Sequence, residues 1–299
     1  MNHEILYYDR ASGCLKTEAI HAAGFLFWSY NTAVGRKMTE TIFRYKPFTK
    51  FYGWIHKTGL SRYKIKPFVE KMHVDMSESH AGAGEFQSFN DFFTREIDLS
   101  KRAIQRDPDV CISPVDGKLL VYPTVGDNRS FQIKRHVFHL CGFLRDSLLT
   151  KKFVEGSMVV CRLSLTDYHH FHFPDSGIPG APHPIPGNYY AGGPYSLSAL
   201  IPFYSENCRM LSLFNSDHFG EMAIVEVGAF TVGSIRQCYV PGMRVTKGSH
   251  KGFFELGGST VVLLFEKGAI HLDLDLCENT EKNLETYVRF GDTIGRVQR

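Results

Sequence analysis

The sequence predicts an α+β protein, in which a helical N-terminal region is followed by a β-rich, mainly antiparallel main domain. From about Cys111 onward, short β-branched and aromatic runs alternate with Gly, Pro, Asn and Asp, a pattern typical of strands joined by turns. Before residue 81 the chain is rich in basic and aromatic residues, which we interpret as helical. We therefore expect a helical, basic-aromatic region 1–80 that associates with membranes and a β-rich domain 81–299 that carries the chemistry.

The composition is that of an ordinary globular protein. Of the 299 residues, 43% are hydrophobic and 22% are charged, so the chain can build a sizeable core and is neither fibrous nor disordered. Its seven cysteines are odd in number and far apart, with no Cys-x-x-Cys pair. This usage argues against a disulfide framework and a thiolate zinc site, and it favours a reducing compartment.

Four apolar runs predict strands of the main domain: Met158–Leu165, Met222–Ile235, Thr260–Glu266 and Ile270–Leu276. The last of these alternates apolar and polar residues with period two, which predicts a strand with one solvent-facing side. Residues 187–194 are crowded with Gly, Pro and Tyr and predict a long loop.

Positive charge is concentrated in residues 36–71. This segment holds ten Lys or Arg against two Glu, a balance of +8, whereas the whole chain carries +3. Eight aromatic residues are interleaved with the cations, a mixture suited to a membrane surface with anionic lipid. An ordinary helical segment, with its aromatics packed on the main domain and its cations solvated, explains the composition equally well. No recognition-helix or RNA-binding signature supports nucleic acid as a partner.

Any membrane contact is expected to be peripheral. Residues 1–10 are polar and charged, and no apolar stretch follows a basic start, so we expect no secretory signal. The longest apolar-aromatic run near the start, residues 22–28, is too short to cross a bilayer.

The first candidate for chemistry is a serine directly after two glycines. Gly257 and Gly258 precede Ser259, which in turn enters the apolar run 261–265. Taken alone, this pattern is more often a plain turn before a strand. A functional serine needs a nearby base, because a neutral hydroxyl is a weak nucleophile.

Three imidazoles within four residues, His169, His170 and His172, are candidates for that base. A metal site is disfavoured, because the segment offers no carboxylate or thiol at a familiar ligand spacing. In a regular strand His170 and His172 share one face and His169 faces away. Joint use of His169 and His172 therefore requires a bulge or a bend.

The third candidate is Asp116, which lies in an Asp-Gly turn before the predicted strand 119–122. Such turns are common hairpin corners, and that reading is the simpler one in isolation. A carboxylate beside an imidazole, however, fixes the tautomer and stabilises the imidazolium. An Asp, His and Ser site follows if the fold brings the three segments together.

Together these segments resemble the phosphatidylserine decarboxylase family. Its members carry, in this order, a Ser-Pro-x-Asp-Gly turn, an Asp-Tyr-His-x-x-His segment and a Leu-Gly-x-Ser-Thr cleavage site, and all three are present. The similarity extends to residues 88–96, residues 227–235, and Lys247-Gly248 before residues 252–254. It covers the chain from about residue 85 to the C-terminus.

The resemblance implies a role for each motif residue. Asp116 matches the triad carboxylate, His172 the base, Ser259 the nucleophile, and His169 a histidine used in decarboxylation. Cleavage between Gly258 and Ser259 is expected to leave a large N-terminal and a small C-terminal chain that remain associated.

Two positions depart from the family pattern. His170 stands where a larger basic residue, usually Arg, is expected, and Lys134-Arg135 stands where Lys-Gly is expected. Neither position belongs to the triad, so the roles of His170 and Arg135 are left open.

The resemblance implies a phosphatidylserine decarboxylase that forms phosphatidylethanolamine and CO₂. Ser259 is expected to become a covalent pyruvoyl group by serinolysis and to bind the substrate amine as a Schiff base, with no metal. The expected partners are phosphatidylserine in a membrane, an anionic lipid surface and, as an option, a second copy of the chain. The expected location is peripheral, on the cytoplasmic face of the cell membrane.

Three alternatives stay open. A hydrolase of esters or peptides would keep Ser259 intact, although the chain lacks a Gly-x-Ser-x-Gly elbow. A non-processing homologue would bind lipid without releasing CO₂. A pyruvoyl-dependent decarboxylase of a soluble amino acid is the closest rival, and the basic aromatic segment is the main reason to prefer a lipid.

Overall fold

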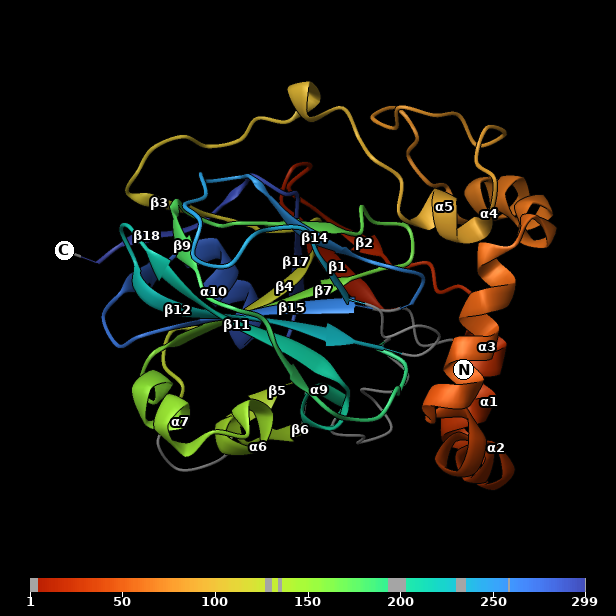
Figure 1. Cartoon of the computed structure of the whole chain (residues 1–299), viewed down its shortest axis with the longest axis horizontal. Helices are drawn as coiled ribbons and strands as arrows, with labels where there is room; N and C mark the ends of the chain where they lie inside the picture. The colour runs from red at the N-terminus through yellow and green to blue at the C-terminus, as the bar shows by residue number, and fades with distance from the viewer. Residues whose placement is uncertain are drawn as a thin grey trace.

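A computed structural model describes residues 5–126, 131–133, 136–192, 203–229, 235–257 and 259–298. A layer of N-terminal helices lies beside a β-rich body (Figure 1), which confirms the predicted fold class. Gly258 and Lys134-Arg135 lie outside the described residues, as do residues 193–194 of the predicted loop and residues 230–234 of the family-like segment 227–235.

The helical layer comprises α1 (Ala23–Asn31), α2 (Ala33–Met38), α3 (Lys46–Lys57), α4 (Ile65–Met72) and α5 (Phe89–Phe93), with a π turn at Thr39–Phe43 and a 3₁₀ turn at Gly59–Lys64. Helix α3 begins with Pro47 in its first turn, where the missing N–H costs nothing. Helix α4 buries Ile65, Phe68 and Met72, whose spacing of three and four residues marks one face. These residues pack with Phe89 and others into a satellite core.

An N-terminal hairpin departs from the helical character expected for region 1–80. Strands β1 (Leu6–Asp9) and β2 (Cys14–Thr17) pair across a turn in which Gly13 adopts a φ of 66°. Strand β1 also pairs in parallel with β17 (Glu285–Val288) and so extends the main sheet. The open edge of β17 offers backbone partners to this segment, which is why a strand forms there, and the helices begin at Ala23.

The main sheet has ten strands among the described residues, and its main path runs β10-β11-β12-β15-β7-β4-β17-β1-β2. Besides those already bounded, these are β4 (Gly117–Tyr122), β7 (Ser157–Leu163), β10 (His183–Ile185), β11 (Arg209–Ser216), β12 (Gly220–Gly228) and β15 (Ser259–Phe265), with β9 (Gly177–Pro179) paired to β11. All pairs except β1–β17 are antiparallel. Every residue of β7 and β15 is buried, as expected for central strands.

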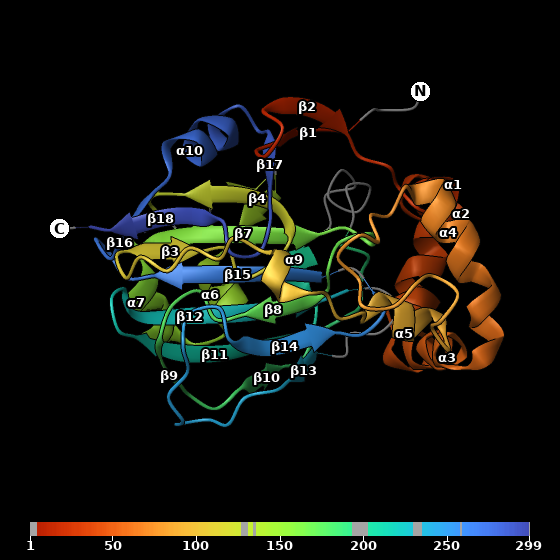
Figure 2. The same cartoon turned by 90° about the horizontal axis from the view of Figure 1, so that it is seen from above.

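Smaller elements cover both faces of this sheet (Figures 1 and 2). One face carries a three-stranded sheet of β13 (Ile235–Gln237), β14 (His250–Phe254) and β8 (His170–His172), and another of β16 (Ile270–Leu272), β18 (Thr293–Val297) and β3 (Val110–Ile112). The other face carries α6 (Leu140–Leu144), α7 (Ser147–Phe153) and α9 (Phe203–Glu206). Strands β5 (Phe131–Ile133) and β6 (His136–Phe138) form a separate pair. A 3₁₀ turn at Leu99–Lys101 lies in the connection from α5 to β3.

Two of the predicted strands are shorter than expected. The prediction of a strand over 270–276 is wrong beyond Leu272, because helix α10 (Leu274–Glu281) begins there and buries Leu276 while Leu274 is 71% exposed. Alternation of apolar residues cannot separate a strand from the first turn of a helix over so few residues. The predicted strand 222–235 is represented by β12, which ends at Gly228, and by β13, which begins at Ile235.

The predicted loop is confirmed as far as the structure describes it, since residues 187–192 belong to no helix or strand. Within the described part of the chain, no helix combines the length and the apolar character needed to span a bilayer.

Candidate active site

The predicted nucleophile and the predicted carboxylate lie at the same end of the main sheet. Ser259 begins β15 and pairs with Leu163 at the end of β7, while Lys118 of β4 pairs with Arg162 of β7. The register therefore sets Gly117, Leu163 and Ser259 side by side on adjacent strands. At about 4.8 Å per strand, the backbones at Gly117 and Ser259 are roughly 10 Å apart.

Ser259 is buried, and its hydroxyl has no hydrogen-bond partner among the described residues. An unpaired buried polar group costs on the order of 1–3 kcal/mol, so such a group calls for a functional explanation. Gly257 adopts a φ of 149°, a backbone conformation that favours glycine. This explains why a glycine stands immediately before the predicted cleavage site.

His172 is buried in β8, and its hydrogen bonds define its tautomer. Its Nδ1 lies 3.0 Å from the carbonyl oxygen of Gly248 and its Nε2 lies 3.2 Å from the hydroxyl of Tyr168. Because a carbonyl oxygen only accepts, Nδ1 carries the proton and Nε2 presents a lone pair. Burial lowers the pKa of His172 to about 3, so the ring is neutral at pH 7, as a base must be.

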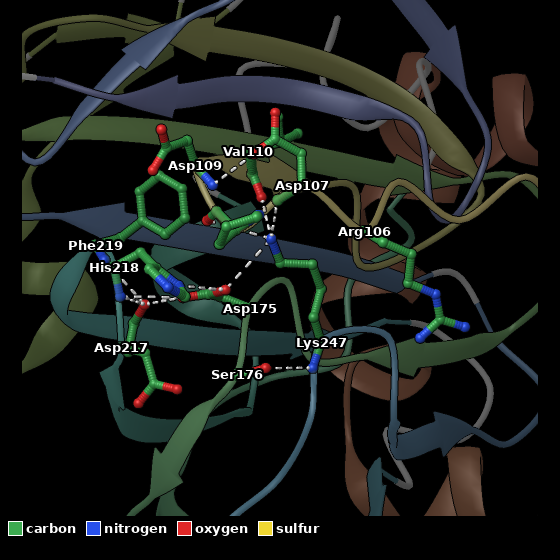
Figure 3. Close-up of polar contacts among 12 residues, drawn as sticks. Arg106, Asp107, Asp109, Val110, Asp175, Ser176, Asp217, His218, Phe219 and Lys247 are labelled. Atoms are coloured by element: carbon green, nitrogen blue, oxygen red, sulfur yellow. Dashed lines mark hydrogen bonds and ion pairs between the residues drawn. The ribbon is translucent and has the colours of Figure 1, made fainter.

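The loop that supplies the Gly248 carbonyl is anchored by the buried ammonium of Lys247 (Figure 3). Its Nζ donates to the carbonyls of Asp107 at 2.7 Å and Val110 at 2.6 Å, and it lies 3.5 Å from the carboxylate of Asp175. The fixed position of this loop holds the ring of His172. The sequence pointed to Lys247-Gly248 through the family resemblance alone.

Asp116 is buried and bound mainly by Arg102, through hydrogen bonds of 2.9 and 2.8 Å, and by the amide of Phe290 at 2.7 Å. Within the described residues, Asp116 and His172 share no hydrogen bond. Phe290 connects them, since its ring stacks on the His172 ring with centroids 3.8 Å apart. Sequence reasoning missed Arg102 and Phe290, because neither belongs to a motif and both reach the site through tertiary packing.

His169 lies just before β8 and is fully buried. Its ring packs on the ring of Phe93 with centroids 3.7 Å apart, and its Nδ1 lies 2.8 Å from the carbonyl oxygen of Asp167. Its Nε2 has no partner among the described residues. Burial and the charge of Arg95 lower the pKa of His169 well below its usual range.

As predicted, His170 and His172 share one face of the strand, since both rings contact His250 while Phe171 enters the core. His170 Nδ1 lies 2.9 Å from His250 Nε2, and its own Nε2 lies 3.0 Å from the Thr94 carbonyl. The register of β8 against β14 shifts between His250 and Gly252. This irregularity lies in β14, so the bulge or bend expected between His169 and His172 stays a prediction.

A cavity of about 680 Å³ opens between the helical layer and this end of the sheet. Its walls are mainly apolar and include Phe25, Phe68 and Met72 on the helical side. Leu163, which pairs with Ser259, and Leu256 line it on the sheet side. The cavity therefore reaches the residues that flank the predicted nucleophile.

Comparison with known proteins identifies the protein as a decarboxylase, because the family model described as phosphatidylserine decarboxylase matches residues 89–296. The chain belongs to the phosphatidylserine decarboxylase family. A phosphatidylserine decarboxylase proenzyme of Clostridium beijerinckii is 43% identical over 97% of this chain and 98% of its own length. Proenzymes of the same name from Desulfitobacterium hafniense (strain Y51) and Chlamydia trachomatis serovar D are 41% and 40% identical, over 97–98% of each chain. The similarity thus extends through the N-terminal helices.

Proposed function

We propose that this chain is a phosphatidylserine decarboxylase proenzyme that cuts itself between Gly258 and Ser259 and decarboxylates phosphatidylserine with a pyruvoyl group made from Ser259. The observation that carries the proposal is the buried, unpaired Ser259 hydroxyl at the start of β15, in a chain of this family. His172 is neutral and lies beside the turn that carries Asp116, since its amide donates to the Pro114 carbonyl, and an apolar cavity reaches the residues that flank Ser259. The enzyme is a carboxy-lyase.

Self-cleavage begins when the Ser259 oxygen attacks the Gly258 carbonyl carbon and the peptide bond becomes an ester. His172 takes the hydroxyl proton at Nε2, because its Nδ1–H is held by Gly248. The Tyr168 hydroxyl, which lies 3.2 Å from this Nε2, has to turn away for the transfer. Loss of the Ser259 α-proton and departure of the Gly258 carboxylate leave a dehydroalanine. Addition of water and loss of ammonia then convert it into a pyruvoyl group, so that no external cofactor is consumed.

Asp116 belongs to the same site and supports His172 through Phe290. The carboxylate fixes the Phe290 amide, and the Phe290 ring fixes the plane of the imidazole. Arg102 neutralises the Asp116 charge in this buried setting, where an unpaired carboxylate would be costly.

The surroundings of Ser259 fit a pyruvoyl group. The hydroxyl makes no hydrogen bond among the described residues. Replacing it by a ketone therefore leaves no donor or acceptor of these residues without its partner. When formed, the group supplies a ketone for the substrate amine and an electron sink for the bond broken as CO₂ leaves. His169, whose Nε2 is unpaired within the described residues, delivers the proton that replaces the carboxylate on the substrate carbon.

After cleavage the two chains have a structural reason to remain together. The small chain would begin with β15, which is hydrogen-bonded to β12 on one side and to β7 on the other. Every residue of β15 is buried. Separation would expose an interior strand of the main sheet, at a large cost in buried apolar area.

The helical layer is the face proposed to meet the membrane, at the cytoplasmic surface. Phe51 and Trp54 are 59% and 62% exposed and stack with centroids 6.2 Å apart. Phe43 and Phe68 are buried, as expected where aromatics pack on the protein, whereas the exposed pair supports the membrane proposal. Tyr52 stacks on His56 and lines the cavity, and it therefore belongs with the inward-facing residues.

The proposal is tested by incubating the purified chain with phosphatidylserine in detergent micelles and measuring chain cleavage and CO₂ release. Cleavage at Ser259 with CO₂ release supports it. An intact chain that hydrolyses esters would instead indicate a serine hydrolase, and an intact chain that binds lipid without CO₂ release a non-processing homologue. A cleaved chain that decarboxylates free serine but not the lipid would indicate a soluble substrate.

A further inference from the structure

The cavity beside Ser259 has an uneven distribution of charge. Lys64, Lys71, His21 and His56 line its helical side. Among the described lining residues the one carboxylate is Glu18, which lies 2.7 Å from Arg162 and 3.2 Å from Lys118. The lysines at the helical end therefore share the cavity with a single carboxylate among its described lining residues, and that carboxylate is already paired with two other cations.

Lys64 is held in place by a neutral histidine. His56 Nδ1 lies 2.9 Å from the Tyr52 carbonyl oxygen, so this nitrogen donates and Nε2 accepts. The Lys64 Nζ lies 3.3 Å from that Nε2. An ammonium has three donors, and this contact uses one, which leaves two for a ligand. Burial, with a smaller effect of Lys64, lowers the pKa of His56, which keeps the ring in its accepting form.

Lys71 lies on the same face of the helical segment as Lys64. The two residues are seven positions apart with Phe68 between them, a spacing that aligns side chains along one helix face. The ring of His21 packs edge-on against the ring of Phe68, with centroids 5.1 Å apart. His21 therefore lies at the same helix face as the two lysines. No described residue forms an ion pair with Lys64 or Lys71, which leaves their charge available to an anion.

We infer that Lys64 and Lys71, with His21, bind the phosphodiester of the lipid substrate at the helical end of this cavity. This inference rests on the proposed function. These residues would distinguish a phospholipid from a free amino acid. The basic segment 36–71 would then act inside the site as well as at a membrane surface.

The chemistry of the substrate favours the phosphodiester over the carboxylate as the bound anion. The carboxylate loses its charge as CO₂ forms, so a fixed cation there would stabilise the ground state and slow the reaction. The phosphodiester keeps its charge throughout, so binding it lowers KM at no cost in kcat. The apolar walls beside the cations suit the glycerol and acyl portions of the same molecule.

The test uses the variant Lys64→Gln/Lys71→Gln, with Lys151→Gln/Lys282→Gln as a control of equal charge loss far from the cavity. Uncharged detergent micelles that contain phosphatidylserine remove the effect of a charged membrane surface. We expect the cavity variant to cleave itself fully and to keep kcat within about threefold. Its KM should rise about 10- to 100-fold, as for loss of hydrogen bonds to a charged group. The control should match the unsubstituted enzyme.

A binding measurement tests the inference without catalysis. In the uncleaved Ser259→Ala chain, millimolar glycerophosphoserine should bind measurably more tightly than serine, and the Lys64→Gln/Lys71→Gln change should remove that difference. Equal binding with and without the two lysines, or no preference for glycerophosphoserine, would overturn the inference. Failure of the unsubstituted chain to cleave or to release CO₂ would instead overturn the proposed function, whatever the binding result.

Discussion

The Nδ1 nitrogen of His172 lies 3.0 Å from the carbonyl oxygen of Gly248. This contact, rather than a carboxylate, sets the tautomer of the proposed base in the uncleaved chain. The ring is further held by stacking on Phe290, whose amide binds Asp116. In this arrangement Asp116 reaches the imidazole of His172 through Phe290, and the role of each residue in the predicted triad stays open to test.

The two histidines should have separable roles. Replacing His172 by Ala should block self-cleavage, because no other base is assigned to the Ser259 proton. Replacing His169 by Ala should leave cleavage largely intact and abolish CO₂ release, because the proton for the product carbon is lost. A denaturing gel and a CO₂ assay measure the two steps separately, and equal loss of cleavage in both variants would refute the assignment.

The Lys247 anchor should matter for stability and for cleavage. Lys247→Met removes the ammonium that faces Asp175 and the donor to two carbonyls, and it leaves Asp175 with Ser216 and His218 as its side-chain partners. This should lower the free energy of unfolding by about 3 kcal/mol in the uncleaved Ser259→Ala chain. Adding Asp175→Asn should recover part of this loss. Self-cleavage, measured for the same substitutions in a chain that keeps Ser259, should stay slow in the double variant. The reason is that the loop with Gly248 still lacks the contacts of the Lys247 ammonium with two backbone carbonyls. Recovery of stability and of cleavage together would show that Lys247 has no positioning role.

Acid should destabilise the uncleaved protein through its buried histidines. Burial lowers the pKa of His170 to about 4, below its ordinary value, so the unfolded chain binds more protons between pH 6.5 and 4. Stability should therefore fall as pH falls through this window, by on the order of 3 kcal/mol for His170. Urea unfolding of the Ser259→Ala chain at pH 7 and pH 4.5 measures this, and His170→Gln should lose less than its parent. Equal losses would contradict the burial argument.

Membrane binding should depend on exposed aromatics and cations of the helical layer. Phe51→Ser/Trp54→Ser should weaken co-sedimentation with anionic vesicles even at high salt, because ring insertion is insensitive to salt. Lys46→Gln/Lys50→Gln/Lys66→Gln should weaken it at low salt, since each exposed cation contributes on the order of 1 kcal/mol near an anionic surface. A matched control is Leu148→Ser/Val240→Ser, two exposed apolar residues outside the helical layer. If the aromatic and the cation variants both pellet like the unsubstituted chain, this layer is not the membrane face.

Local patterns predicted much of the fold and the motif residues of the site. The runs at 158–165 and 260–266 form β7 and β15 because β-branched residues bounded by turns leave few alternatives. The first strand was not predicted, since β1 depends on the edge of β17, nearly 280 residues away in sequence. The partners of Asp116 and the cavity were missed for the same reason, because Arg102, Phe290 and the helical layer meet the site through tertiary packing.

Intact mass spectrometry of the purified chain will show whether self-cleavage turns Ser259 into a pyruvoyl group. We expect two chains, residues 1–258 and residues 259–299, with the smaller one lighter than its sequence by the mass of ammonia. The Ser259→Ala variant should remain a single chain. A single uncleaved chain from the unsubstituted protein, or a C-terminal fragment that begins with an ordinary serine, would show that Ser259 does not become a pyruvoyl group.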